Sequence, residues 1–127
     1  MELSKRKILI VDDDELVLSV LSLLLTPYLC EIKTINSPGI VMETINEFQP
    51  DLIILDMNYT KGNYDGHEGI YWLQNIKKEN PESKIIVFSG SFDSTLLTKA
   101  YDIGAIGHLE KPWKNEELIK LIIEHTG

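Results

Sequence analysis

The sequence of 127 residues has very little cysteine, because Cys30 is the only one. A single cysteine excludes a disulfide within the chain and a zinc site built from several thiolates. Long apolar runs are also missing, and none approaches the roughly 20 residues that a membrane-spanning helix needs. The polar start of the chain has no apolar stretch of the kind found in signal peptides. We therefore expect a cytoplasmic protein without a membrane segment.

Basic residues are scarce, with 12 Lys and Arg against 20 Asp and Glu, which gives a formal net charge of -8. Surfaces that bind nucleic acid need clustered Lys and Arg, so we expect no direct nucleic-acid binding by this domain. The acidity alone is also compatible with an ordinary solvated surface. With 43% hydrophobic residues, the chain can bury a core, and we expect residues 1–127 to form a single domain.

Short apolar runs recur along the chain, and amphipathic segments separate them. Three runs are rich in β-branched residues, which is typical of strands buried on both faces of a parallel sheet. A fourth segment alternates between apolar and polar residues and a fifth is weaker, so both are expected at the edges of the sheet. The predicted strands are residues 8–11, 30–35, 52–55, 85–88 and 105–109.

Helical spacing of apolar residues fills the intervals between the predicted strands. Residues 16–25 form the first helix, Ser37 and Pro38 are an N-cap and first-turn proline for the second, and Asn115 is an N-cap for the last. Gly104 is placed to end the fourth helix. The apolar stripes of the later helices are Val41, Met42, Ile45 and Phe48, then Ile70, Leu73 and Ile76, then Leu96, Leu97, Ala100 and Ile103, then Leu118, Ile119, Ile122 and Ile123.

Alternating strands and helices predict an α/β fold, a doubly wound (βα)5 sandwich in which helices cover both faces of a parallel sheet. In such sheets, ligands bind beyond the carboxyl ends of the strands. The residues that follow each predicted strand are therefore the candidates for function.

Acidic residues follow two of these strands, namely Asp12, Asp13 and Asp14 after the first and Asp56 after the third. Carboxylates that converge in one cleft repel one another unless a cation is present, and oxygen ligands suit Mg2+, with Mn2+ as the alternative ion. We expect Asp12, Asp13 and Asp56 to bind that ion and Asp14 to cap the next helix. A purely capping role for Asp12 and Asp13 stays open, because a helix N-terminus favours negative charge.

Asp56 is a candidate nucleophile, since a carboxylate can attack phosphorus to form an acyl phosphate. Ser89 offers a hydroxyl donor to a phosphoryl oxygen, and Gly90 leaves room for close approach. Lys111 would pair with a phosphoryl oxygen, and the bond that joins it to Pro112 can be cis. Each of these residues is also common in ordinary turns and surfaces, so the hypothesis depends on their lying together.

Four segments carry a family pattern: Ile-Leu-Ile-Val-Asp-Asp-Asp (8–14), Asp-Leu-Ile-Ile-Leu-Asp-Met-Asn (51–58), Ile-Ile-Val-Phe-Ser-Gly (85–90) and Gly-His-Leu-Glu-Lys-Pro-Trp (107–113). Together they resemble the receiver domains of bacterial two-component response regulators over residues 7–125. The resemblance implies a flavodoxin-like, CheY-like sandwich with strand order 2-1-3-4-5. It also implies a signalling domain, not an enzyme, whose donor is a phosphohistidine on a sensor histidine kinase or a phosphotransfer protein.

The resemblance assigns roles to individual positions. Asp12 and Asp13 match the acidic pair that binds Mg2+, Asp56 matches the phosphoacceptor, and Asn58 matches the position whose backbone carbonyl ligates the metal.

Further positions match the switch and the lysine of the family. Ser89 matches the switch hydroxyl, Lys111 the lysine that pairs with the phosphoryl group, and the Lys111–Pro112 bond a peptide that is usually cis. Phosphorylation is then expected to change the surface formed by the fourth helix, the fifth strand and the fifth helix, through which two copies can pair. Tyr101, His108 and Trp113 lie on or near that surface.

The sequence departs from the family at two places. His108 stands where the family usually has Tyr or Phe, which leaves open whether it acts as a switch or is inert and exposed. The segment 58–69 is longer than usual and lacks the proline that normally follows the acceptor, so it is either a turn-rich excursion beside the site or a neutral insertion. This segment and residues 111–115 resemble N-terminal receivers of sigma-54-dependent, NtrC-type transcriptional regulators, which adds control of transcription to the expected function.

Three alternatives stay open. An aspartate-nucleophile phosphatase usually needs a second Asp two residues after the first, where this chain has Asn58. A flavin-binding module would place the flavin phosphate beside the acids at 12–14, which would repel it. A degenerate receiver, acting only as an interaction module, would keep the fold without accepting phosphate.

Overall fold

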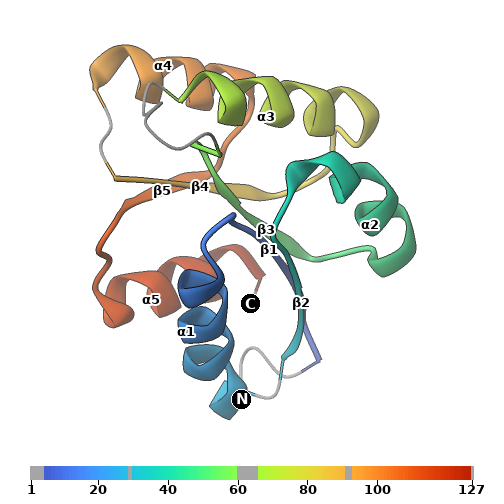
Figure 1. The fold of residues 1–127 in the computed structure, drawn as a ribbon, viewed down its shortest axis with the longest axis vertical. Coiled ribbons are helices and arrows are strands. Elements are labelled where there is room, and N and C mark those ends of the chain that lie inside the picture. The colour runs from blue at the N-terminus through green and yellow to red at the C-terminus, as the bar shows by residue number, and fades with distance from the viewer. Residues whose placement is uncertain (1–4, 29, 60–65, 91–92, 127) are drawn as a thin grey trace.

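The computed structural model describes residues 5–28, 30–59, 66–90 and 93–126. Within these ranges, five strands and five α-helices alternate along the chain (Figure 1). The strands are β1 (Lys7–Val11), β2 (Glu31–Ile35), β3 (Leu52–Asp56), β4 (Ile85–Ser89) and β5 (Gly107–Glu110). The helices are α1 (Glu15–Leu25), α2 (Val41–Phe48), α3 (His67–Glu79), α4 (Ser94–Ile103) and α5 (Asn115–Thr126).

The strands form one sheet in the order β2-β1-β3-β4-β5, and every neighbouring pair is parallel. The predicted order and the predicted edge positions are therefore confirmed. All five residues of β3 and of β4 are buried, which agrees with the apolar runs at 52–55 and 85–88 that precede Asp56 and Ser89.

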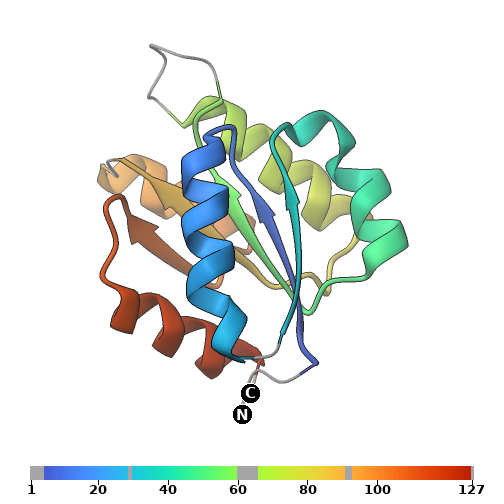
Figure 2. The same ribbon diagram turned by 60° about the horizontal axis from the view of Figure 1, so that its bottom comes forward.

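Helices cover both faces of the sheet, as Figure 2 shows for α1 and α5 on one side and α2 and α3 on the other. Alternate residues of β1 face different layers, so that Ile8 and Ile10 pack with the residues of α1 and α5, whereas Leu9 and Val11 pack with α2, α3 and α4. This alternation follows from the two-residue period of a strand. None of the helices in the described ranges is long and apolar enough to cross a bilayer.

The predicted capping roles of Asp14 and Gly104 are confirmed, and those of two other residues differ. Asp14 caps α1 by accepting a hydrogen bond from Leu16 N, and Gly104 ends α4. Ser37, in contrast, caps a short 3-10 turn (Pro38–Ile40) that precedes α2. The N-cap predicted at Asn115 is wrong, because Asn115 is already the first helical residue and its side chain accepts a hydrogen bond from the Trp113 indole.

The fifth strand begins two residues later than predicted. The backbone N–H of Ala105 donates to the carbonyl of Ala100, so Ala105 still completes the end of α4. Pairing with β4 starts at Gly107. The apolar run at 105–109 therefore serves both the helix end and the strand, which its sequence alone does not distinguish.

Gly69 allows the first turn of α3 to lie directly against the residue that follows β3. A Cβ at this position would lie 2.4 Å from the Cα of Met57, which is a backbone atom and cannot turn aside. We expect Gly69→Ala to lower the free energy of unfolding by about 2 kcal/mol or more, measured by urea denaturation. Gly90→Ala is the control, since a Cβ there meets no described atom within 4 Å; equal effects of the two substitutions would contradict this packing.

Candidate functional site

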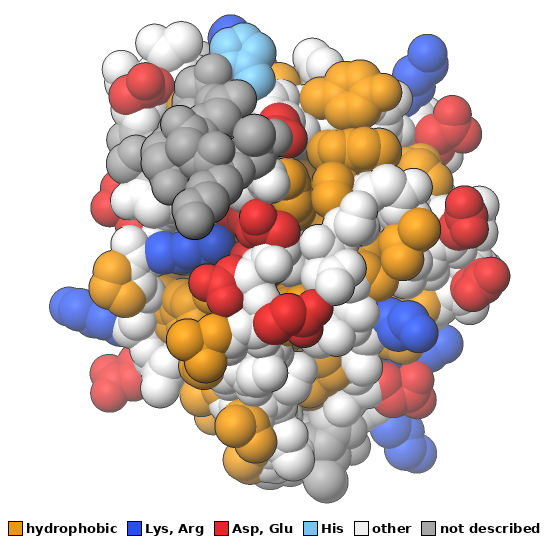
Figure 3. Space-filling view, viewed as in Figure 1, with side chains coloured by type: hydrophobic (Ala, Val, Ile, Leu, Met, Phe, Trp, Pro, Cys, Tyr) orange, Lys and Arg blue, Asp and Glu red, His pale blue; other side chains and the backbone are white. Residues whose placement is uncertain are grey.

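Three carboxylates meet at the carboxyl edge of the sheet. Asp12 directly follows β1 and is 1% exposed, Asp56 is the last residue of β3 and is 3% exposed, and Asp13 is exposed to solvent. One oxygen of each can be chosen so that all three lie within 4.8 Å of one another. Figure 3 shows acidic side chains gathered beside a basic one near the centre of this face. The parallel sheet thus brings together acids that are 44 residues apart in sequence.

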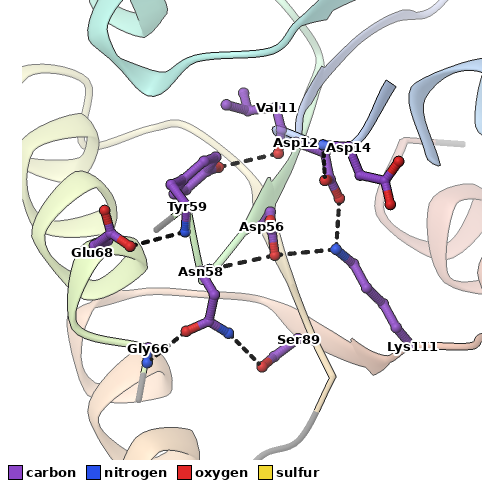
Figure 4. A network of polar contacts seen from close by, with 10 residues as sticks. All are labelled: Val11, Asp12, Asp14, Asp56, Asn58, Tyr59, Gly66, Glu68, Ser89 and Lys111. Atoms are coloured by element: carbon purple, nitrogen blue, oxygen red, sulfur yellow. Dashed lines mark hydrogen bonds and ion pairs between the residues drawn. The ribbon is translucent and has the colours of Figure 1, made fainter. Parts of the chain in front are cut away.

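Lys111 reaches into the acidic group from the segment after β5. Its Nζ lies 2.7 Å from Asp12 Oδ2 and 3.2 Å from Asp56 Oδ1 (Figure 4). The backbone N–H of Lys111 donates to the carbonyl of Ser89 at 2.8 Å, and the bond between Lys111 and Pro112 is cis. The lysine therefore bridges the two buried carboxylates.

The electrostatics show that one lysine does not balance these acids. Burial, followed by the charge of Asp12, raises the pKa of Asp56 to about 7, although Lys111 opposes this shift. Burial also raises the pKa of Asp12, against the hydrogen bond from Lys111. Burial disfavours the ammonium of Lys111, yet its hydrogen bond to Asp12 and the charges of both acids raise its pKa. A bound cation would add to the effect of Lys111 and favour the ionised form of both buried acids.

The residues fit a divalent metal ion of the hard, oxygen-binding kind. The donor set consists of carboxylate oxygens from Asp12, Asp13 and Asp56, and Mg2+ typically takes one or two carboxylates and retains several waters. The exposed Asp13 leaves the group open to solvent on one side. Asn58 donates its backbone N–H to Asp56 Oδ1 at 3.4 Å, while the metal-binding role of its carbonyl stays a prediction.

Asp13→Asn is expected to weaken Mg2+ binding by roughly tenfold or more, because it removes one full negative charge from the donor set. Isothermal titration with MgCl2 measures the effect. Asp14→Asn is the matched control, since Asp14 caps α1 and asparagine caps equally well. Equal Mg2+ affinities of the two variants would contradict a role for Asp13 in metal binding.

Ser89 and Asn58 are joined by their side chains. Ser89 is the last residue of β4 and is fully buried. The Asn58 side-chain amide donates to Ser89 Oγ at 3.1 Å, and its Oδ1 accepts a hydrogen bond from the backbone N–H of Gly66 at 2.8 Å (Figure 4). Sequence reasoning used only the backbone of Asn58 and missed this side-chain bridge.

Tyr59 and Glu68 also belong to the site and were not predicted. The Tyr59 hydroxyl donates to the carbonyl of Val11 at 3.1 Å, and its backbone N–H donates to Glu68 Oε1 at 2.9 Å. Burial, with the charges of Asp56 and Asp12, raises the pKa of Tyr59 well above its usual value. Of the segment 58–69 singled out from the sequence, residues 60–65 lie outside the described residues.

His108 is half-buried in β5 and contacts α4. Its Nδ1 lies 2.7 Å from the Tyr101 hydroxyl, and the two rings meet edge to face with centroids 5.7 Å apart. Nearby, Trp113 stacks on Phe88, the neighbour of Ser89, with centroids 5.4 Å apart. His108 is thus only partly exposed, and whether it acts as a switch or is inert stays a prediction.

A five-stranded parallel sheet of this order, with acids, a hydroxyl and a lysine at its carboxyl edge, defines the class of CheY-like signalling domains. The chain belongs to the response regulator receiver domain family, whose sequence pattern matches residues 8–123.

Solved structures of receiver domains are closely similar to this chain. The N-terminal signal receiver domain of a two-component response regulator from Bacteroides fragilis is 30% identical, with a TM-score of 0.84 and 98% of each chain covered. NtrX from Brucella abortus is 27% identical with a TM-score of 0.81, and the match covers 94% of this chain but 26% of NtrX.

Curated relatives include transcriptional regulators. The probable C4-dicarboxylate response regulator DctR of Bacillus subtilis (strain 168) is 32% identical over 88% of this chain and 48% of DctR. The regulator NtrC of Azospirillum brasilense is 32% identical over 94% of this chain and 24% of NtrC. The chain therefore spans about half the length of DctR and a quarter of NtrC. The predicted resemblance to NtrC-type regulators is confirmed, and DctR has the same sequence identity to this chain as NtrC of Azospirillum brasilense.

Proposed function

We propose that this chain receives a phosphoryl group on Asp56, with Mg2+ bound by Asp12, Asp13, Asp56 and the backbone carbonyl of Asn58. The donor is a phosphohistidine on a sensor histidine kinase or a phosphotransfer protein, and this chain acts in the cytoplasm. The observation that carries the proposal is the cluster in which Lys111 contacts both buried carboxylates, Asp12 at 2.7 Å and Asp56 at 3.2 Å.

In the transfer step, a carboxylate oxygen of Asp56 forms a bond to phosphorus as the bond between phosphorus and the donor imidazole nitrogen breaks. The bonding electron pair stays on that nitrogen. Lys111 stabilises the ionised carboxylate and can follow the negative charge onto the phosphoryl oxygens. Bound Mg2+ would supply further charge neutralisation. The domain is a phosphoacceptor that assists its own phosphorylation and dephosphorylation, and it turns over no separate substrate.

The new group carries roughly two negative charges, and it attracts the Ser89 hydroxyl and Lys111. Ser89 lies next to Phe88, on which Trp113 stacks, and β5 carries His108 against Tyr101 of α4. Movement at Ser89 is thereby passed to the surface formed by α4, β5 and α5. A partner, or a second copy of this chain, shifts the switch by binding the altered surface more tightly.

The output is proposed from the relatives, among which NtrC is a DNA-binding transcriptional regulator. Residues 1–127 act as a single receiver domain in this proposal, and the chain itself contacts no nucleic acid or membrane. Control of transcription then lies in a separate output domain or a partner protein.

The test is to incubate the protein with acetyl phosphate and Mg2+ and to measure its intact mass. A gain of one phosphoryl group, absent when EDTA replaces Mg2+, is the expected result. No gain with any divalent ion would contradict phosphoacceptance and would favour the degenerate receiver.

A further inference from the structure

We propose that the side chain of Asn58 is a positioning residue that holds the Ser89 hydroxyl away from Asp56 until the phosphoryl group arrives. This inference rests on the proposed function and deepens it. Asn58 would act in two separate ways, through its backbone carbonyl toward the metal and through its amide toward the switch hydroxyl.

The orientation of the Asn58 amide is fixed by chemistry. The backbone N–H of Gly66, 2.8 Å away, can only donate, so it must face the amide oxygen. The amide NH2 is then directed at Ser89 Oγ, 3.1 Å away. Ser89 therefore accepts a hydrogen bond from Asn58, and Figure 4 shows its hydroxyl directed toward Asn58 and away from the Asp56 carboxylate.

Gly66, whose N–H donates to the Asn58 amide oxygen, is held in place by its conformation and its packing. It precedes α3 with a φ of 79°, a left-handed conformation that favours glycine. A Cβ on Gly66 would lie 2.6 Å from Leu96 Cδ1, so the start of α3 packs tightly against α4. Because Gly66 is held between Asn58 and Leu96, the amide of Asn58 has little freedom to follow Ser89.

The consequence is a restraint on the unphosphorylated state. When Ser89 turns toward the phosphoryl group, its hydrogen bond from Asn58 must break. A ligand that binds only the state with Ser89 turned toward Asp56 has its apparent affinity reduced by the fraction of molecules in that state. Removing the amide is expected to strengthen binding of a phosphoryl mimic by roughly three- to tenfold, the value of one hydrogen bond.

The experiment titrates beryllium fluoride, a mimic of the aspartyl phosphate, into the Mg2+-saturated protein. Trp72→Phe serves as the background, so that Trp113, stacked on Phe88, is the one remaining tryptophan of the two in the sequence. Apparent dissociation constants are compared for this background, Asn58→Ala, Ser89→Ala and the double variant. Alanine at position 58 keeps the backbone carbonyl proposed for the metal, and every variant is titrated at its own saturating Mg2+ concentration so that differences in metal affinity do not enter the comparison.

Tighter binding by Asn58→Ala, with no further effect of that substitution when Ser89 is already alanine, is the expected result. Weaker or unchanged binding of beryllium fluoride by Asn58→Ala would overturn the inference. So would an equal effect of Asn58→Ala with serine and with alanine at position 89, because Asn58 would then not act through Ser89. If Asn58→Ala does not give a cooperative thermal transition, Asn58→Ser replaces it, because serine is too short to join Gly66 and Ser89. No binding by the background protein would contradict the proposed function, and the inference with it.

Discussion

Asp56→Asn is expected to abolish phosphorylation by acetyl phosphate, so that the intact mass no longer increases. An amide oxygen is a far weaker nucleophile than a carboxylate oxygen, and the substitution also removes one charge from the metal-binding group. Asparagine has nearly the same shape, and it can still accept the hydrogen bond that Asn58 N donates to Asp56 Oδ1. The fold should therefore remain, and loss of phosphorylation should reflect the lost nucleophile and the weakened metal site, not unfolding.

Asp51→Asn provides the matched control for this loss. Asp51 is an exposed acid just before β3 that accepts a hydrogen bond from the backbone of Lys7, so it lies at the opposite end of the strand from Asp56. This variant should gain one phosphoryl group to the same extent as the unaltered chain. Phosphorylation that persists in Asp56→Asn, or that disappears in Asp51→Asn, would contradict the choice of Asp56.

Asp56→Asn is also expected to stabilise the metal-free protein at pH 8 by about 4 kcal/mol. Folding raises the pKa of Asp56 from an ordinary value of 3.8 to about 7, chiefly through burial and then through the charge of Asp12. Between these two values the folded state binds more protons than the unfolded state, so stability falls as the pH rises from about 4 to 7. At pH 8 both states are ionised, and the full cost of the buried charge is present.

Urea unfolding in EDTA at pH 8 and at pH 5 measures this cost. The difference between Asp56→Asn and the unaltered chain should narrow to under about 2 kcal/mol at pH 5, where the folded carboxyl is protonated. Saturating Mg2+ should stabilise the unaltered chain more than the variant, since a ligand stabilises the state that binds it. A difference that is the same at both pH values would mean that the charge of Asp56 is not its cause.

The sheet and the positions of the acids were accessible from the sequence for simple reasons. A run such as 52–55 has no polar residue, so it is compatible with burial on both faces, and parallel strands place their following residues at one edge. Asp12, Asp56, Ser89 and Lys111 could thus be grouped from their positions after the predicted strands alone. Their roles in phosphoryl transfer remain predictions that the experiments above address.

The contacts that the sequence did not reveal depend on the paths of loops and on side-chain rotamers. The bridge from Asn58 to Ser89 and Gly66 joins residues whose spacing forms no periodic pattern. The contact between Tyr59 and Val11 depends on how the chain turns after β3. A Glu in the first turn of α3, Glu68, was visible in the sequence, but its acceptance of the Tyr59 N–H was not.

The pairing of His108 with Tyr101 was missed for a related reason. The two residues are seven apart, one near the end of α4 and the other in β5, and only the turn between these elements brings their side chains to 2.7 Å. Sequence comparison identified His108 as unusual but could not identify its partner. The side chain of Tyr101 is 43% exposed and contacts His108 of β5. In the proposed switch, β5 responds to the movement of Ser89.

The most direct test of phosphoacceptance by Asp56 is to locate the phosphoryl group chemically. Borohydride reduces an acyl phosphate to an alcohol, so a phosphorylated aspartate becomes homoserine, which mass spectrometry of peptides can identify. After treatment with acetyl phosphate and Mg2+, we predict homoserine at position 56 and at no other acid of the group. Homoserine at Asp12 or Asp13, or a phosphoryl group that resists borohydride because it lies on Ser89, would contradict this prediction.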